Sequence, residues 1–138
     1  MIREGEPADW PQLRRIQAAT LSDPWPELLE MALGEPSLVL VLERTDLIGY
    51  ALVVPDGKRA YLAEFAITPG QQGQGHGTTL MEALLDRLGR DGVETIRLTA
   101  RADDEHVHAF YETQGFRIID RVPDQYDSGD GLLFEWKL

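Results

Sequence analysis

A glycine-rich stretch, ITPGQQGQGHGT at residues 67–78, contains the residues best suited to hold a ligand. Four glycines fall between Gly70 and Gly77, and no side chain in the stretch is charged, although 27% of the chain is. Glycines let a ligand approach the main chain, and the first N–H groups of a following helix lack internal partners. The pattern therefore predicts a site for a phosphate chain, bound by peptide dipoles rather than by lysines.

The spacing excludes several common phosphate loops. A Walker A loop needs Gly-Lys-Ser/Thr, but Gly77 is followed by two threonines. A dinucleotide fingerprint and a kinase glycine loop both need a third glycine where this sequence has Thr78. The phosphate ligand must therefore belong to another class.

Three histidines raise the question of a metal site. His106 and His108 are two positions apart on a predicted helix, so they do not face one another, and the chain has no cysteine. We therefore expect no metal site. His76 falls in the glycine-rich stretch, where a protonated ring would help to bind an anion; the alternative is a solvated side chain.

Alternating helices and strands position these residues. Helices are predicted at 6–21, with Asp9 as candidate N-cap, at 24–33, after the glycines, and from Asp103 or Asp104 through Tyr111. Strands are predicted at 37–43, 47–54, 60–67, 93–100, 116–122 and 131–138, with a short one at the N-terminus. The order predicts one α/β domain, residues 1–138, with a mixed, mostly antiparallel central sheet flanked by helices on both faces.

Two segments resemble the GNAT superfamily of N-acetyltransferases. Gln72-x-x-Gly75-x-Gly77, after a strand that ends near Pro69, resembles the family's acetyl-CoA pyrophosphate loop. HVHAFYETQGFRIID at 106–120 resembles its ALYExLGF helix and strand, and the resemblance covers essentially the whole chain. DPWPELL at 23–29 and DQYDSGDGLLFEWKL at 124–138 are most similar to the ribosomal-protein N-terminal acetyltransferases.

The resemblance implies acetyl-CoA as co-substrate and an amine as acceptor. It implies that the backbone of Phe65, Ala66 and Ile67 pairs with the pantetheine arm. The pyrophosphate would be cradled by the N–H groups of Gln72, Gly73, Gln74, Gly75, His76, Gly77 and Thr78. Asp104, where relatives often carry Asn, would touch the cofactor, and Tyr111 would protonate the leaving thiolate as general acid; the alternative for Tyr111 is a packed core aromatic.

Glu64 is the candidate base. Strand alternation places its side chain on the face of Leu62 and Ala66, among apolar neighbours. A carboxylate there could take a proton from an ammonium group, directly or through water. The alternative is a structural acid paired with an arginine. Thr99 stands where the ribosomal-protein branch carries its catalytic Glu, so the base is either Glu64 or water.

The remaining alternatives differ in the molecule that accepts the acetyl group. A protein N-terminus fits the branch that the sequence resembles, and a small amine such as a polyamine, amino acid or aminoglycoside is the alternative enzyme reading. A non-catalytic acyl-CoA-binding module is the alternative outside enzymes. A homodimer is compatible with each of them.

The composition bears on the partners and the cellular location of the protein. A net charge of -11 argues against a nucleic-acid partner, and no apolar run approaches the roughly 18 residues of a membrane span. The N-terminus has no signal pattern, so we expect a cytoplasmic protein. Twenty-four acids against two lysines look like a halophilic adaptation, and the alternative is an ordinary acidic cytosolic protein.

We predict that stability and activity rise with salt. The Debye length falls from about 10 Å at 0.1 M to about 3 Å at 1 M, so salt screens the repulsion between the acids. Thermal melting in KCl over that range measures the effect, with sucrose as the uncharged control. A maximal melting temperature in dilute buffer would show that the acidic surface is incidental.

Overall fold

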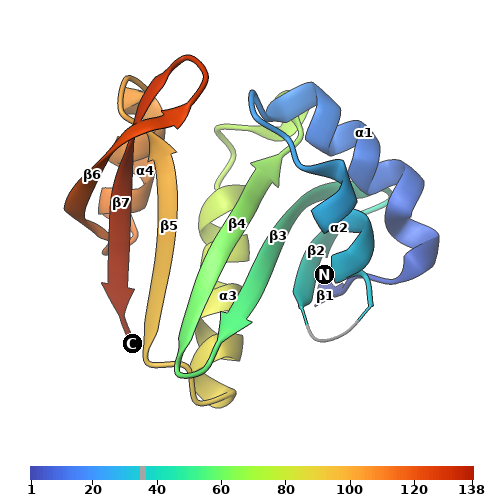
Figure 1. Cartoon of the computed structure of the whole chain (residues 1–138). Helices are drawn as coiled ribbons and strands as arrows, with labels where there is room; N and C mark the ends of the chain where they lie inside the picture. The colour runs from blue at the N-terminus through green and yellow to red at the C-terminus, as the bar shows by residue number, and fades with distance from the viewer. Residues whose placement is uncertain (35–36) are drawn as a thin grey trace.

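Figure 1 shows the computed structural model, a twisted seven-stranded sheet with helices on both faces, which describes residues 1–34 and 37–138. The strands are β1 (Ile2–Glu4), β2 (Leu38–Glu43), β3 (Leu47–Asp56), β4 (Arg59–Ile67), β5 (Thr95–Arg101), β6 (Arg117–Tyr126) and β7 (Gly129–Lys137). The helices are α1 (Trp10–Thr20), α2 (Pro26–Ala32), α3 (His76–Arg90) and α4 (Glu105–Thr113), with short 3-10 turns η1 (Pro7–Asp9) and η2 (Pro69–Gln71). None of the helices described is long and apolar enough to cross a membrane.

The sheet has the predicted mixed and mostly antiparallel character. Its strand order is β1-β2-β3-β4-β5-β7-β6. β4 pairs with β5 in parallel, and every other neighbouring pair described is antiparallel. The predicted fold class, an α/β sheet covered by helices on both faces, is confirmed.

Two apolar cores lie on opposite faces of the sheet. Leucines and a methionine recur at helical spacing along α3 and pack with α4 against one face, which gives the larger core. Leu13 and Ile16 of α1 and Leu29 of α2 pack against the other face. β2 and β3 are buried on both faces, which explains why their sequences are almost continuously apolar.

β4 separates from β5 after a short stretch of pairing. The two strands are in register only from Arg59 to Tyr61 of β4, opposite 95–97 of β5. Leu62 lies opposite Val53 and Glu64 opposite Leu52, so Ala63 is an extra residue in β4, a β-bulge. A bulge bends its strand and increases the local twist, and β4 and β5 diverge beyond it in Figure 1.

An ion cluster holds the N-terminal segment. The Arg3 guanidinium donates to Asp9 at 2.8 and 3.0 Å and to Glu43 at 3.2 and 3.1 Å. The Glu6 N–H also donates to Asp9, at 2.8 Å. Asp9 does precede α1, as predicted, but its carboxylate bonds to these groups and makes no cap bond to the helix. The hydrogen bonds from Arg3 hold the pKa of the Asp9 carboxyl below its ordinary value, against the effect of burial.

We predict that Asp9→Asn lowers the free energy of unfolding at pH 7 by about 1–3 kcal/mol, because charged hydrogen bonds are lost. Since the folded-state pKa of Asp9 is depressed, its stabilisation is complete above the ordinary Asp pKa. It disappears as the pH falls through the depressed value. Urea unfolding from pH 7 to pH 2 should therefore show the wild-type and variant curves converging in acid. The exposed Asp46→Asn is the matched control, and equal losses in both variants would contradict the ion-cluster role.

Candidate active site

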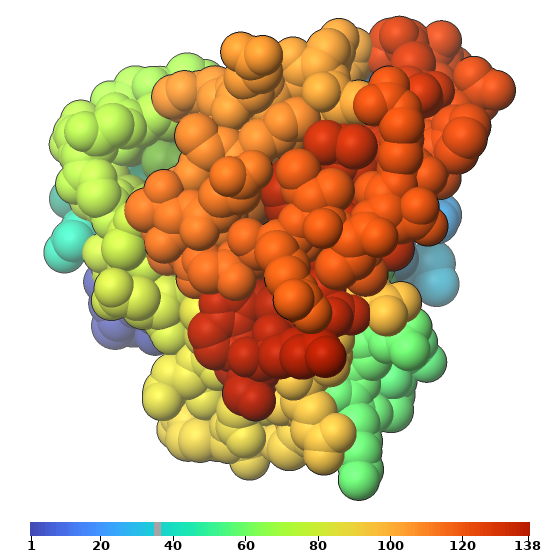
Figure 2. All heavy atoms as spheres, turned by 90° about the vertical axis from the view of Figure 1, so that its left-hand side faces the viewer, coloured from blue at the N-terminus to red at the C-terminus, as the bar shows by residue number. Residues whose placement is uncertain are grey.

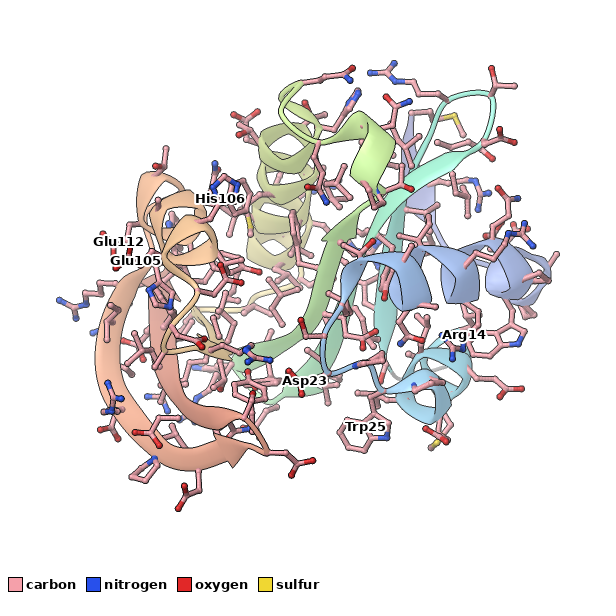
Figure 3. All side chains as sticks on the ribbon, turned by 90° about the horizontal axis from the view of Figure 1, so that it is seen from above. Arg14, Asp23, Trp25, Glu105, His106 and Glu112 are labelled. Atoms are coloured by element: carbon pink, nitrogen blue, oxygen red, sulfur yellow. The ribbon has the colours of Figure 1, made fainter. Side chains whose placement is uncertain are left out.

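A cleft of about 1370 Å³ opens where β4 and β5 separate. Its loop half is lined by the glycine-rich loop and α4. Its other half is lined by the segment joining α1 to α2 and by residues of β5 and β6, and we call it the α1–α2 half. Figure 3, from above, shows Asp23 of that segment in the opening, facing the β5–β7 side of the molecule.

Most of the predicted site residues line this one cleft. They are Glu64, Phe65, Ile67, Gln72, Gly73, Gly75, Gly77, Thr78, Asp104 and Tyr111. Ala66, Gln74 and His76 are not in its lining; Ala66 is buried in the sheet opposite Tyr50. For Ala66 and Gln74 the prediction concerned the backbone alone, so their side-chain positions do not decide it. The predicted role of the His76 ring stays a prediction, since this partly exposed side chain is outside the lining.

The glycine-rich loop has the shape of an anion site. Gly73 and Gly75 have φ of 77° and 84°, which favours glycine over any other residue. Gly75 is the N-cap of α3, so the N–H groups that follow it are those a helix leaves unbonded. Gly77 is needed for another reason: a Cβ there would lie 3.1 Å from the Phe110 ring.

Gln72 ties this loop to β4. Its side-chain Nε2 donates to the Ile67 carbonyl at 2.8 Å. The carbonyl of Ile67 is therefore already engaged within the protein. The contact fixes the distance between the loop and the end of the strand.

Tyr111 combines a packed ring with a hydroxyl at the cleft. Its ring centroid lies 5.4–6.4 Å from four phenylalanine rings, on Phe65, Phe110, Phe116 and Phe134. The hydroxyls of the other three tyrosines each donate a hydrogen bond, whereas in the described chain the Tyr111 hydroxyl donates none. Burial raises its pKa well above the ordinary value, and nearby acidic groups act in the same direction. The hydroxyl therefore keeps its proton far into the alkaline range.

Asp104 and His108 have structural contacts, whereas His106 lines the cleft. Asp104 caps α4, since its Oδ1 accepts the Val107 N–H at 3.2 Å. His108 lies 2.7 Å from the Arg101 carbonyl through Nε2, and His106 is exposed on α4 (Figure 3). Among residues 1–34 and 37–138 no group of three His, Cys, Asp or Glu could hold a metal ion.

The predicted face of Glu64 was right for Ala66 and wrong for Leu62. Leu62 packs in the α3–α4 core, whereas Ala66 packs in the α1–α2 core. The bulge at Ala63 breaks the alternation between them, which sequence periodicity could not reveal. The Glu64 side chain lies with Ala66, toward α1 and α2.

Neutral donors surround the Glu64 carboxylate, which is 7% exposed. Gln17 Nε2 of α1 donates to both oxygens, at 2.8 and 3.1 Å. The Trp25 N–H at the start of α2 and the Tyr50 hydroxyl of β3 donate at 3.0 Å each. The expected alternative, pairing with an arginine, is therefore wrong. Glu64 instead joins α1, α2 and β3 at the edge of the cleft.

Sequence reasoning missed the partners of Glu64. Gln17 is fully buried and stands in the apolar stripe of α1, and Tyr50 is fully buried in an apolar strand. A polar group inside an apolar stripe was the available signal. Its partner, however, is 47 residues away and could not be identified from one sequence.

Two further tyrosines meet at Thr99 of β5. The Tyr61 hydroxyl donates to Thr99 Oγ1 at 3.0 Å, and the Tyr126 hydroxyl donates to its carbonyl at 3.1 Å. Burial, with Tyr61 and Asp23 nearby, raises the pKa of Tyr126 to about 12. These uncharged hydroxyls line the α1–α2 half. Position 99, where the sequence comparison expected a catalytic Glu, thus carries a threonine that is bonded to two tyrosines.

The cleft thus offers an anion site, a protonated phenol and a buried carboxylate. The loop half suits a phosphate-bearing molecule. The α1–α2 half, with Asp23 and Glu64 at its edge, suits a cationic or amine group. A reaction between the two bound molecules would take place where β4 has left β5.

Comparison with known proteins gives one consistent result. Residues 3–116 match the model of the Acetyltransferase (GNAT) family. The ribosomal protein bS18-alanine N-acetyltransferase of Escherichia coli (strain K12) is 30% identical over 128 residues, which cover 91% of this chain and 86% of that protein.

Solved structures agree with this match. The ribosomal-protein-S18-alanine N-acetyltransferase from Escherichia coli has a TM-score of 0.91 at 26% identity, over 99% of this chain and 92% of that one. The PaiA N-acetyltransferase from Thermoplasma acidophilum, in complex with coenzyme A, shares the fold with a TM-score of 0.85 at 18% identity, over 100% and 98%.

We predict that Gln17→Leu destabilises the protein by about 1–3 kcal/mol, because it leaves a buried carboxylate short of a donor. Chemical denaturation measures the loss. The matched control is the same change in a Glu64→Leu background, where the carboxylate is absent and the loss should largely vanish. Strict additivity of the two changes would show that the Gln17–Glu64 contact contributes nothing.

Proposed function

The chain belongs to the GNAT family of acetyltransferases, and from this premise we propose that it acetylates the amino terminus of a protein, using acetyl-CoA. The observation that carries the proposal is that Tyr111 and Glu64 line the same cleft. The curated relative that is 30% identical is named for the alanine of a ribosomal protein, which supports a protein N-terminus as acceptor.

Acetyl-CoA fits the loop half. The N–H groups around Gly75 would receive its pyrophosphate, and the α3 dipole would favour the negative charge. β4 residues beyond Tyr61 have no partner strand on the β5 side, so the backbone groups between Phe65 and Ile67 that face this open side would receive the pantetheine amides. The CoA complex of a fold relative supports this use of the fold.

Tyr111 would act as the acid. As the acceptor nitrogen bonds to the thioester carbon, the carbon–sulfur bond breaks and the sulfur leaves with the electron pair. Tyr111 donates its proton to that sulfur, giving the free thiol. Its raised pKa keeps the proton available at neutral pH.

Glu64 would take the proton that the amine must lose, directly or through a water molecule. Its carboxylate lies at the edge of the α1–α2 half and already accepts bonds from Gln17, Trp25 and Tyr50. That proton can return through solvent to Tyr111, so the enzyme ends in its starting state.

The setting is part of the proposal. A cytoplasmic protein in a salt-rich cell would explain why acids outnumber lysines so strongly. An anionic surface would favour cationic acceptors at low salt and would act less strongly as salt rises.

The assay is thiol release from acetyl-CoA with a panel of acceptors. We expect turnover with peptides that have a free amino-terminal alanine and none with N-formylated copies. If only polyamines are acetylated, the acceptor is a small amine and not a protein N-terminus. Binding of acetyl-CoA without thiol release from any acceptor would indicate a binding module.

We predict that Gly75→Val sharply raises the KM for acetyl-CoA, because a side chain would stand in the phosphate's path. Gly57→Val is the matched control: Gly57 also has a positive φ, 64°, and a Cβ at either position meets nothing within 4 Å. Both variants should lose about 1–2 kcal/mol of stability through backbone strain. Equal KM values in the two variants would mean that the loop holds no phosphate.

We predict that Tyr111→Phe lowers kcat by roughly 10², the usual scale for one positioned acid. The ring packing remains, so the Kd for acetyl-CoA and the melting temperature should change little. The loss should be equal in kcat and in kcat/KM for the acceptor, as for an interaction made only in the transition state. Wild-type kcat in the variant would leave Tyr111 as core packing.

A further inference from the structure

One residue of β7 faces a three-residue bulge in β6. Val122 lies opposite Gly131, and Tyr126 lies opposite Gly129. Asp130 is therefore the single β7 residue across from 123–125 of β6. The tip of this hairpin, residues 124–130, projects at the upper edge of the molecule in Figure 2.

The Asp130 carboxylate bridges the two ends of the bulge. Oδ1 accepts the Asp124 N–H at 2.9 Å, and Oδ2 accepts Arg121 Nε at 2.9 Å. The Asp130 carbonyl also accepts the Ala102 N–H at 2.9 Å, which fixes the hairpin to the end of β5. The two side-chain contacts hold the pKa of Asp130 below its ordinary value.

The bulge has a backbone that needs such support. Asp124 has φ of 52°, and no other non-glycine residue in the described chain has a positive φ. Pro123 has no N–H to give to the sheet. The Asp124 N–H, with no ladder partner, is satisfied by Asp130 instead.

The bulge sets the position of its last residue, Gln125, and of the residue after it, Tyr126. Gln125 and Tyr126 both line the α1–α2 half of the cleft. Gln125 crosses over Gly131, where a Cβ would lie 3.0 Å from the Gln125 Cβ. Tyr126 reaches the Thr99 carbonyl. Because the bulge adds two residues, it keeps the alternation of the strand but shifts where along the cleft these side chains stand.

We propose that Asp130 is a positioning residue for the acceptor: it holds the β6 bulge so that Gln125 and Tyr126 form one wall of the acceptor half. The proposal rests on the proposed function in taking the α1–α2 half as the acceptor side. Asp130 itself is not in the lining of the large cleft and need not touch the acceptor.

The kinetic test compares Asp130→Ala with Asp127→Ala. Asp127 is an exposed acid in the same hairpin, so its variant loses the same charge without touching the bulge. Asp130→Ala should raise the acceptor KM by roughly tenfold, a moderate misplacement effect, and leave the acetyl-CoA KM unchanged. Asp127→Ala should change neither. Asp130→Asn retains an acceptor for the Asp124 N–H, so its acceptor KM should lie between those of the two alanine variants.

The second test follows the environment of the Tyr126 ring by its titration and needs no enzymatic activity. In protein labelled with ¹³C at the tyrosine rings, the Tyr126 phenol, assigned through Tyr126→Phe, should titrate near its raised pKa of about 12. In Asp130→Ala it should move toward the ordinary value of about 10 as the ring gains solvent. Asp127→Ala should titrate like the wild type.

Both measurements must move for the proposal to stand. An unchanged acceptor KM in Asp130→Ala overturns it, and so does an unchanged Tyr126 titration. If Asp130→Ala does not fold, Asp130→Asn is judged by the same two measurements. If the wild-type protein acetylates no acceptor, the proposed function fails, whereas the positioning of Tyr126 is still decided by the titration.

Discussion

The extra residue Ala63 in β4 is the constraint on which the geometry of the site depends. A regular β4 would remain paired with β5 along its length, and no cleft could form between them. The bulge ends that pairing after Tyr61 and turns Glu64 toward α1 and α2. The next residue, Phe65, faces α4 and contacts the Tyr111 ring. Consecutive residues of one strand thereby serve opposite sides of the same opening.

The two groups proposed for proton transfer are buried in different ways. The Glu64 carboxylate accepts hydrogen bonds from three residues, which offset the cost of removing its charge from water. The Tyr111 hydroxyl is neutral, so its burial costs far less than that of a charge, and its ring packs among phenylalanines in the α3–α4 core. Glu64 therefore has a structural duty that Tyr111 lacks, and any loss of activity on changing Glu64 must be compared with its loss of stability.

The fold and the glycine-rich side of the site could be predicted from the sequence. Periodicity gave the element order, and the glycine spacing located the loop that precedes α3. It could not give the face of Glu64, because a bulge adds one residue without a compositional signal. Nor could it give the contacts of Glu64 with Gln17 and Tyr50, which join residues far apart in the chain. Asp130 was visible as part of a motif, but its position opposite three β6 residues appears only in the register of the hairpin.

The short ladder between β4 and β5 has a consequence for cooperativity. Three residue pairs are the whole parallel connection between β1–β4 on one side and β5–β7 on the other. With so few hydrogen bonds between them, the two parts are held together mainly by the α3–α4 core, which packs against both. If they open separately, amide hydrogen exchange reports the openings as distinct foldons. A molecule bound in the cleft would contact both units and make them exchange as one. Slower exchange in β5 and β7 on ligand binding would then reflect the joining of two halves of a sheet, rather than a local contact.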